Sequence, residues 1–415
     1  MTLPSKEALG CIYGADAERA ETRYENLAAA FEKQFGKAEP EFFTAPGRTE
    51  IIGNHTDHNG GRILAASISL DTIAAAAKTD GTVITIISEG YDRPIVVDTA
   101  KLDEVPKNQG SISLVGGIMT AAIRFGYRIG GFNAYVSTEV ISAAGVSSSA
   151  SFEMLVCSIV NFFFNDGVID CAHYARMGQY AENHFWNKAS GLMDQMACAA
   201  GGTILLDFSD GVQCKKVDFD FDQIGYDEVI INTGKGHADL SAEYSSIPLE
   251  MRSVAHELGA DNLCGASEEA LLAGLPAIRK KLGNDRAILR ALHYFEECRR
   301  VDQAAAALTR GDAKQLLSII EESGRSSWDW LQNVYCINDS SEQSIPLALA
   351  LTQIFTGRIG KGVARIHGGG FAGVIMAVIP KEHTAEYVDF MTDFFGRENI
   401  YVMGIRQTGA VHVGR

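Results

Sequence analysis

The stretch from residue 132 to residue 164 limits the possible folds of this chain more than any other feature. Residues 132–140 alternate between apolar and polar side chains, as in a half-buried strand, and residues 152–164 form a largely apolar run of helical length. A helix that is apolar on nearly every side has to be buried. The serine-rich turn between them, AAGVSSSAS, therefore lies at the N-terminus of a buried helix.

This turn, within AAGVSSSASFE at residues 143–153, has two interpretations. Glycine permits close backbone approach, and the unpaired N–H groups at a helix N-terminus, together with the helix dipole, favour phosphate oxygens. The same residues also suit a serine N-cap. The lysine of GxxxxGK[ST] is missing, which disfavours a Walker-type NTPase. The candidate phosphate-binding residues are Gly145, Val146, Ser147, Ser148, Ser149 and Ala150.

Length and charge limit the classes of partner. With 415 residues, 46% of them hydrophobic, the chain can bury the cores of two or more domains. The formal net charge of −16 opposes extended contact with nucleic acid or an anionic membrane, so we expect neither as a partner. A site for ATP is compatible with that charge, because local amides and a metal ion hold a triphosphate whatever the global balance.

Cysteine usage and the N-terminus predict a cytoplasmic protein. The eight cysteines include no CxxC pair and no zinc-ligand spacing, so we expect reduced thiols. The sequence MTLPSKEALG lacks the basic and apolar regions of a signal peptide, and no apolar stretch approaches about 18 residues.

Hydrophobic periodicity predicts alternating helices and strands. We expect an antiparallel meander over residues 63–98, a loop leading into GLMDQMACAAG, and a last strand pair in YVMGIRQTGAVHV. A strand at TILLDF approaches a predicted domain boundary, which divides the chain into residues 1–205 and 206–415, with the last strands free to return to the first domain. Helices are expected near residues 21–35, 111–125, 152–164, 171–187, 248–258, 268–273, 288–308 and 313–322.

A polar cluster follows a predicted strand in APGRTEIIGNHTDHNGG, residues 45–61. The strand carries Arg48, and the cluster contains Asn54, His55, Asp57 and His58. Planar hydrogen-bonding groups of this kind recognise polyols. An Asx-rich turn with solvated side chains is the alternative.

Two carboxylates and a glycine run complete the candidate site. Asp194 stands in the apolar stretch GLMDQMACAAGG, which favours either a functional role or an ion pair. Glu182, on the preceding predicted helix, is either a second carboxylate for Mg²⁺ or an exposed helix residue. RIHGGGFAG, residues 365–373, allows a backbone turn close to a ligand or forms a simple tight turn.

Four motifs in this order resemble the galactokinase family of the GHMP kinase superfamily: GRxxxIGxHTDxNxG, GxSSSASxE, GxMDQ and ARxxGGGFxG. The resemblance spans nearly the whole chain. It implies an α+β GHMP kinase fold, with an N-terminal α/β domain resembling ribosomal protein S5 domain 2, a C-terminal ferredoxin-like domain, and the active site between them. It further implies an ATP-dependent sugar 1-kinase that makes an α-sugar 1-phosphate.

The resemblance also assigns roles by motif. Arg48 and Asp194 would be catalytic and would flank the anomeric hydroxyl. Gly145 to Ala150 would wrap the phosphates of ATP, and Ser149 with Glu182 would hold Mg²⁺. The expected substrate-binding residues are Arg48, Asn54, His55, Asp57, Gly191, Asp194 and Tyr244.

The chain departs from the family's pattern at three pocket positions. Asn54 replaces the usual glutamate, Glu50 the usual asparagine and His58 the usual tyrosine. Loss of an anion at position 54 favours a sugar with a C6 carboxylate, whereas Glu50 restores a negative charge or anchors Arg48. Galactose is the main expectation, and galacturonate, arabinose and N-acetylgalactosamine stay open.

The tryptophan that stacks near adenine in many relatives is missing here, because the corresponding segment is GSISLVGG. A non-catalytic sensor of galactose and ATP is the alternative of another class.

Overall fold

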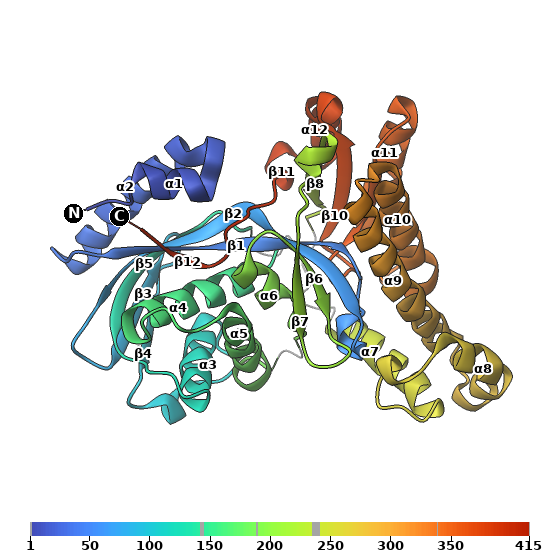
Figure 1. The fold of residues 1–415 in the computed structure, drawn as a ribbon, viewed down its shortest axis with the longest axis horizontal. Helices are drawn as coiled ribbons and strands as arrows, with labels where there is room; N and C mark the ends of the chain where they lie inside the picture. Colours follow the sequence, from blue (N-terminus) through green and yellow to red (C-terminus); the bar gives the residue numbers. More distant parts are fainter. Residues whose placement is uncertain (1, 142–144, 188–189, 235–240, 338, 415) are drawn as a thin grey trace.

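Two β-sheets form the framework of the molecule (Figure 1). The computed structural model describes residues 2–141, 145–187, 190–234, 241–337 and 339–414. The larger sheet has the strand order β12-β1-β2-β5-β3-β4, with β6 and β7 attached to β2. Its strands are β1 (Glu41–Ile52), β2 (Arg62–Lys78), β3 (Val83–Ser88), β4 (Ile95–Asp98), β5 (Phe132–Thr138), β6 (Thr203–Asp207), β7 (Gln213–Val217) and β12 (Val411–Val413). The smaller sheet, in the order β11-β8-β10-β9, contains β8 (Tyr226–Asn232), β9 (Val363–His367), β10 (Val374–Pro380) and β11 (Ile400–Met403).

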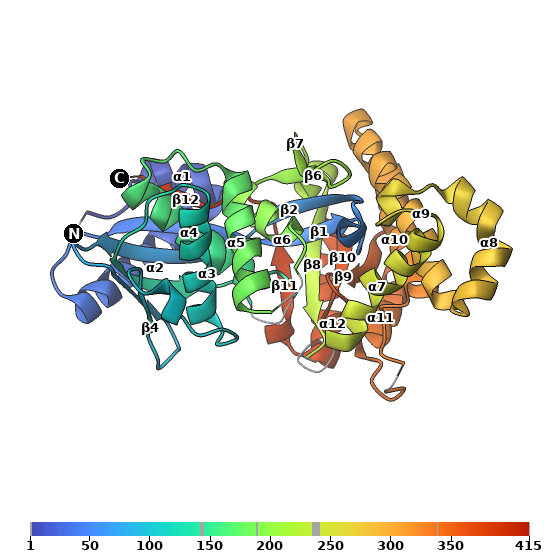
Figure 2. The ribbon, with the colours of Figure 1, turned by 90° about the horizontal axis from the view of Figure 1, so that it is seen from below.

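Helices cover both faces of the larger sheet (Figure 1). One face carries α1 (Lys6–Tyr13) and α2 (Ala17–Phe35), and the other carries α3 (Ser111–Arg124), α4 (Ser148–Phe164), α5 (Cys171–Phe185) and α6 (Met193–Ala200). Figure 2, from below, shows these four helices across the sheet. Helix α4 is buried along most of its length and shares a core with β2, β3 and β5. The apolar run of residues 152–164 thus forms the predicted buried helix.

The smaller sheet joins the two halves of the molecule because its two faces pack against different partners. On β10, Ile375 and Ile379 face a core shared with the helices α11 (Ser344–Ile359) and α12 (Lys381–Phe395). The alternate residues Val374 and Met376 share a core with β1, β2 and the helices α9 (Asp285–Arg310) and α10 (Ala313–Ser326). Helices α7 (Ser241–Glu257) and α8 (Glu268–Leu282) extend beyond this core, at the end away from both termini (Figure 2).

Two predictions about strand pairing are wrong. Residues 63–98 do not form a simple meander, because β5 lies between β2 and β3 and runs parallel to β3. The two last strands do not pair with each other: β11 pairs with β8, and β12 pairs with β1. Alternation along one strand predicts which face is buried and carries no information about the neighbouring strand. The segment GLMDQMACAAG contains helix α6, which was not among the expected helices because glycines flank it on both sides.

The chain's two ends lie together at one end of the larger sheet (Figure 1), where Ser5 N–H donates to the Gly414 carbonyl at 3.2 Å. Among the residues that the structure describes, no helix has both the length and the apolar character needed to span a bilayer.

Candidate functional site

Arg48 lies at the centre of the site, on β1, next to an irregularity in its pairing with β2. Its side chain is buried, and its Nε donates to Asp194 Oδ1 at 2.8 Å. Its Nη1 donates to the carbonyl of Gly145 in the serine loop, the name used here for residues 145–150. Burial alone would lower the pKa of the guanidinium, but the adjacent Asp194 carboxylate raises it above its ordinary value. Arg48 is therefore a permanent cation between the serine loop and Asp194.

The serine loop contacts the same carboxylate. Ser147 has a left-handed backbone, with φ of 58°, immediately before α4 begins at Ser148. Its hydroxyl donates to Asp194 Oδ2. Backbone strain of this kind persists where the surroundings enforce it, often at functional sites. Two residues of the predicted phosphate-binding turn, 143 and 144, lie outside the described residues.

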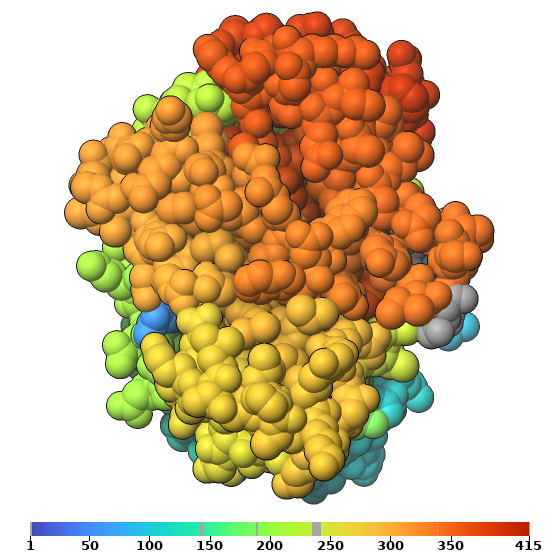
Figure 3. Space-filling view, turned by 90° about the vertical axis from the view of Figure 1, so that its right-hand side faces the viewer, coloured from blue at the N-terminus to red at the C-terminus, as the bar shows by residue number. Residues whose placement is uncertain are grey.

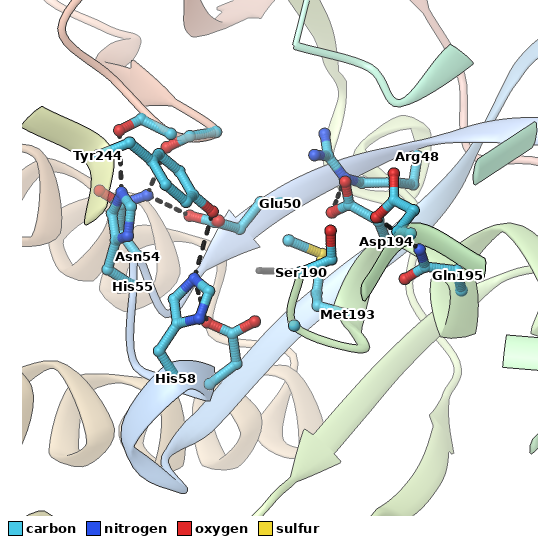
Figure 4. Close-up of a pocket in the computed structure, with 15 residues that line it drawn as sticks. Arg48, Glu50, Asn54, His55, His58, Ser190, Met193, Asp194, Gln195 and Tyr244 are labelled. Carbon is cyan, nitrogen blue, oxygen red and sulfur yellow. Dashed lines mark hydrogen bonds and ion pairs between the residues drawn. The ribbon is translucent and has the colours of Figure 1, made fainter. Parts of the chain in front are cut away.

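Asp194 stands in the first turn of α6, and its side chain keeps 30% of its surface exposed. Of the two alternatives for this residue, an ion pair and a functional role, the structure contains the ion pair. The exposed fraction also leaves the carboxylate open to the pocket, so the two are compatible. Figure 4 shows Arg48 and Asp194 on one side of this pocket and His55, His58 and Tyr244 on the other.

The polar loop, residues 53–61, supplies the opposite side. His55 has φ of 61°, and its ring Nε2–H donates to the Gly369 carbonyl at 2.9 Å. Burial, followed by the nearby His58, lowers the pKa of His55 to about 3, so its ring is neutral. Tyr244, from α7, contacts this loop through His58 Nε2, 3.2 Å from its hydroxyl. Burial raises the pKa of Tyr244 above its ordinary value, so the phenol keeps its proton.

Asp57 and Gly191 lie in direct contact. A Cβ added at Gly191 would stand 2.0 Å from Asp57 Oδ2, so a larger residue would have to displace the Asp57 carboxylate. The GLMDQ segment thereby brings the polar loop and Asp194 to one pocket.

Asn54 and Glu50 form a pair with each other. The Asn54 amide donates to Glu50 Oε1 at 3.0 Å and to the Gly368 carbonyl at 2.8 Å, and its Oδ1 accepts from Asn333. Glu50 accepts a charged hydrogen bond from Arg365 at 3.0 Å. The expectation that Glu50 anchors Arg48 is wrong, because Arg365 is its partner. Sequence reasoning missed Arg365, although ARIH lies beside the glycine run.

The triple-glycine turn, residues 368–370, contacts both loops. Gly368 lies against Gly145, and a Cβ at Gly369 would stand 2.7 Å from the Tyr244 ring. Next to this turn, Glu50 N–H donates to His367 Nε2 at 3.0 Å, which leaves the ring proton on Nδ1. Nearby, burial raises the pKa of Glu228, which accepts from the Thr49 hydroxyl, to about 7.

Ser149 and Glu182 lie close enough to share one cation. Ser149 Oγ is 3.4 Å from Glu182 Oε1, and Gln195 Nε2 lies 3.2 Å from both Glu182 Oε2 and Glu153 Oε2. These oxygen donors match the preference of Mg²⁺, which takes one or two carboxylates and fills its shell with phosphates and water. Within the described part of the chain no three His, Cys, Asp or Glu side chains gather into a metal cage. Ser149 and Glu182 thus fit the partial ligand set of an Mg²⁺ whose remaining ligands are phosphates and water.

The pocket encloses about 490 Å³ of space, including its open mouth. It brings together most of the sequence-predicted residues, namely Arg48, Asn54, His55, Asp57, Glu182, Gly191, Asp194 and Tyr244. Val146 and Ala150, two members of the serine loop, instead bury their side chains in the hydrophobic cores. The individual roles of these residues stay predictions.

Comparison with known proteins agrees with this geometry. The family model named galactokinase galactose-binding signature matches residues 29–78, and the model of the GHMP kinases N terminal domain matches residues 113–202. A galactokinase of Clostridium tetani is 27% identical over 361 residues, which cover 86% of this chain and 88% of the relative. In sequence, the chain is similar to the galactokinase family of GHMP kinases over most of its length.

Solved structures show that members of this family and other GHMP kinases share the fold. A Lactococcus lactis galactokinase complexed with galactose matches with a TM-score of 0.80 and 25% identity, over 93% of this chain and 99% of that one. A Methanococcus jannaschii mevalonate kinase matches with a TM-score of 0.62 and 13% identity, over 90% of this chain and 100% of that one. The GHMP kinase fold expected from the motifs is confirmed.

Proposed function

We propose that this chain is a galactokinase, which transfers the γ-phosphoryl group of ATP to the anomeric hydroxyl of D-galactose and releases α-D-galactose 1-phosphate and ADP. One observation carries the proposal: the Arg48–Asp194 ion pair is bonded to the serine loop at both ends, through Gly145 and Ser147. A base for the sugar hydroxyl and a binding loop for the phosphates are thus joined by direct hydrogen bonds.

The arrangement suits phosphoryl transfer, in which positioning and electrostatics matter more than covalent help. Asp194 accepts the anomeric proton, and Arg48 orients that carboxylate and offsets negative charge near the transferred group. The N–H groups of the serine loop, at the N-terminus of α4, bind phosphate oxygens. His55, Asp57 and Tyr244 hold the other sugar hydroxyls.

Mg²⁺ belongs to this proposal as the companion of ATP. Ser149 and Glu182 would hold it, and it would neutralise charge on the phosphates. Asn54 is the weakest member of the proposed sugar site, because both its amide N–H groups are already used by Glu50 and Gly368. We place the reaction in the cytoplasm.

Charge in the pocket favours a neutral sugar over a uronic acid. Among the described lining residues, Arg48 is the one permanent cation. It faces four carboxyl side chains, those of Glu50, Asp57, Glu182 and Asp194. The neutral His55 gives no positive charge to attract a C6 carboxylate. Glu50 places a carboxyl group next to position 54, but its ion pair with Arg365 offsets that charge, so the excess of carboxyl groups rests on Asp57 and Glu182.

An ATP-consumption assay with a panel of sugars tests the proposal. We expect turnover with galactose, and kcat/KM lower by at least about 100-fold with galacturonate, since an unpaired charge must enter an anionic pocket. Arabinose and N-acetylgalactosamine complete the panel. Faster turnover of any of the three would transfer the assignment to that sugar.

The same assay separates an enzyme from a sensor. A sensor would bind galactose and ATP in calorimetry and consume no ATP with any sugar. The intact set of Ser147, Ser149 and Asp194 supports catalysis.

A further inference from the structure

Helix α9 holds the backbone of the polar loop on the side away from the pocket. The N–H groups of Gly53 and Asn54 donate to Glu297 Oε1 at 3.0 and 3.3 Å. The carbonyl of Asn54 accepts from His293 Nε2 at 3.0 Å. Both polar groups of one loop residue's backbone are therefore bound to side chains of the same helix.

His293 and Glu297 are spaced four residues apart, so they lie on one face of α9. Both are fully buried. His293 Nδ1 accepts from the Ser326 hydroxyl at 2.9 Å, and Glu297 accepts from Ser323 and, at 2.7 Å, from Arg300 Nε. Figure 3 shows the helical segments, yellow to orange, that cover this end of the molecule. Hydrogen bonds from Ser326, Ser323 and Arg300 therefore hold the two side chains in the orientation in which they contact the loop.

Charge supports the same arrangement. Burial would raise the pKa of Glu297, but His293, Arg300 and Arg365 lower it to about 2. The carboxylate is ionised at every physiological pH, and hydrogen bonds to an ionised acceptor are stronger than neutral ones.

The loop needs such support because its backbone is unusual. Gly53 has φ of 118°, and His55, one residue after the anchored Asn54, has φ of 61°. A left-handed conformation at a residue other than glycine lasts only where neighbours impose it. This conformation directs the His55 ring to the Gly369 carbonyl and precedes Asp57 in the pocket.

We propose that His293 and Glu297 are positioning residues that hold the polar loop in the shape that binds the sugar. The inference rests on the proposed function. Neither side chain lines the pocket, so both act through the backbone of Gly53 and Asn54. They affect recognition of the sugar and leave recognition of ATP unchanged.

Kinetics of four variants test the inference. Glu297→Ala removes both loop bonds and should raise the sugar KM by about tenfold or more, with the KM for ATP within about twofold. Glu297→Gln keeps one carbonyl oxygen that can accept from the N–H groups of Gly53 and Asn54, while its NH2 group faces Arg300. Its sugar KM should therefore stay within about threefold of wild type. His293→Leu removes the bond to the Asn54 carbonyl and should raise the sugar KM by about three- to tenfold. Glu296→Ala, the matched control on the same helix, loses an exposed pair with Arg299 and should keep the wild-type KM.

Urea unfolding of each variant separates positioning from general weakening. Glu297→Ala and Glu297→Gln both lose the ion pair with Arg300 and should both be less stable, while the sugar KM rises only in the first. Equal rises in the KM for sugar and ATP, or a sugar KM that follows stability across all four variants, would overturn the inference. His293→Leu decides the case if Glu297→Ala does not fold. A wild-type protein that phosphorylates no sugar would overturn the proposed function, and the inference with it; an active wild type with unchanged variants overturns the inference alone.

Discussion

At the scale of single residues, the site is organised around a carboxylate that accepts a hydrogen bond on each of its two oxygens. Arg48 approaches Asp194 from β1, and Ser147 approaches it from the serine loop. Each bond fixes one carboxylate oxygen, which orients the group toward the pocket. The proposed base, its orienting cation and the backbone proposed to bind phosphate are therefore coupled through one side chain.

Replacement of Asp194 by Asn tests this coupling. The amide keeps the shape and one acceptor for Arg48, but it accepts no proton from the sugar hydroxyl, so kcat should fall by about 10²- to 10⁴-fold. Sugar KM should stay within about an order of magnitude. A steady-state assay of ADP release at varied sugar concentration measures both kcat and the sugar KM. Asp285→Asn, in an exposed pair with Arg279, is the control and should keep wild-type kcat. Near-normal turnover in Asp194→Asn would remove this residue from the mechanism.

At the scale of elements, short backbone approaches determine how loops from distant parts of the sequence fit together. Gly191, in the segment before α6, touches Asp57 of the polar loop, and Gly369 touches the Tyr244 ring of α7. In both cases a methyl group on the glycine would occupy space that is already filled by a residue proposed to bind the sugar, Asp57 or Tyr244. A larger residue at either position would therefore have to displace the side chain of the neighbouring element.

Gly191→Ala should therefore damage the sugar site without unfolding the protein. The new methyl group displaces the Asp57 carboxylate, and a displacement of about 1 Å is enough to raise the sugar KM by roughly tenfold or more. The ATP KM should change little. Gly404→Ala, where nothing lies within 4 Å of the added Cβ, is the control. An unchanged sugar KM in Gly191→Ala would show that Asp57 does not contact the substrate.

Sequence reasoning recovered the elements that periodicity encodes and the pocket residues that motifs encode. The buried helix at α4 and the approach of Arg48 to Asp194 are examples. The pairing partner of each strand could not be predicted, because it depends on contacts between distant parts of the chain. Strand β5, which lies between β2 and β3, is the example. Sequence reasoning also missed the residues behind the pocket, Arg365, His293 and Glu297. A histidine and a glutamate four residues apart on a long helix were the available signal, and such a pair is equally common on exposed helices. The division near residue 205 stays a prediction.

At the scale of the whole molecule, the chain crosses between the sheets more than once. After β11 in the smaller sheet, the last residues return to β12 at the edge of the larger one. Arg406 lies on this return and is buried. Its Nη1 donates to Asp71 Oδ2 at 2.7 Å and to the Thr44 hydroxyl at 2.9 Å. The C-terminal segment is therefore part of the core of the first sheet.

Arg406→Met should weaken the entire fold. Asp71 is fully buried and keeps a second cation, Arg23, at 2.8 Å, so loss of Arg406 leaves it only partly compensated. The free energy of unfolding in urea should fall by about 3 kcal/mol near neutral pH. Arg128→Met, which breaks an exposed pair with Asp166, should leave the urea midpoint unchanged.

The pH dependence of that loss identifies its cause. Burial would raise the pKa of Asp71, but Arg23 and Arg406 lower it below its ordinary value. A lowered pKa stabilises the folded state above the unfolded-state pKa of about 3.9, and this stabilisation disappears as the pH falls through the lower folded-state value. The difference in stability between wild type and Arg406→Met should therefore be largest near neutral pH and shrink as the pH falls below about 4. A difference that is the same at pH 7 and pH 3 would mean that Arg406 stabilises the C-terminal return by packing, and that its charge contributes nothing.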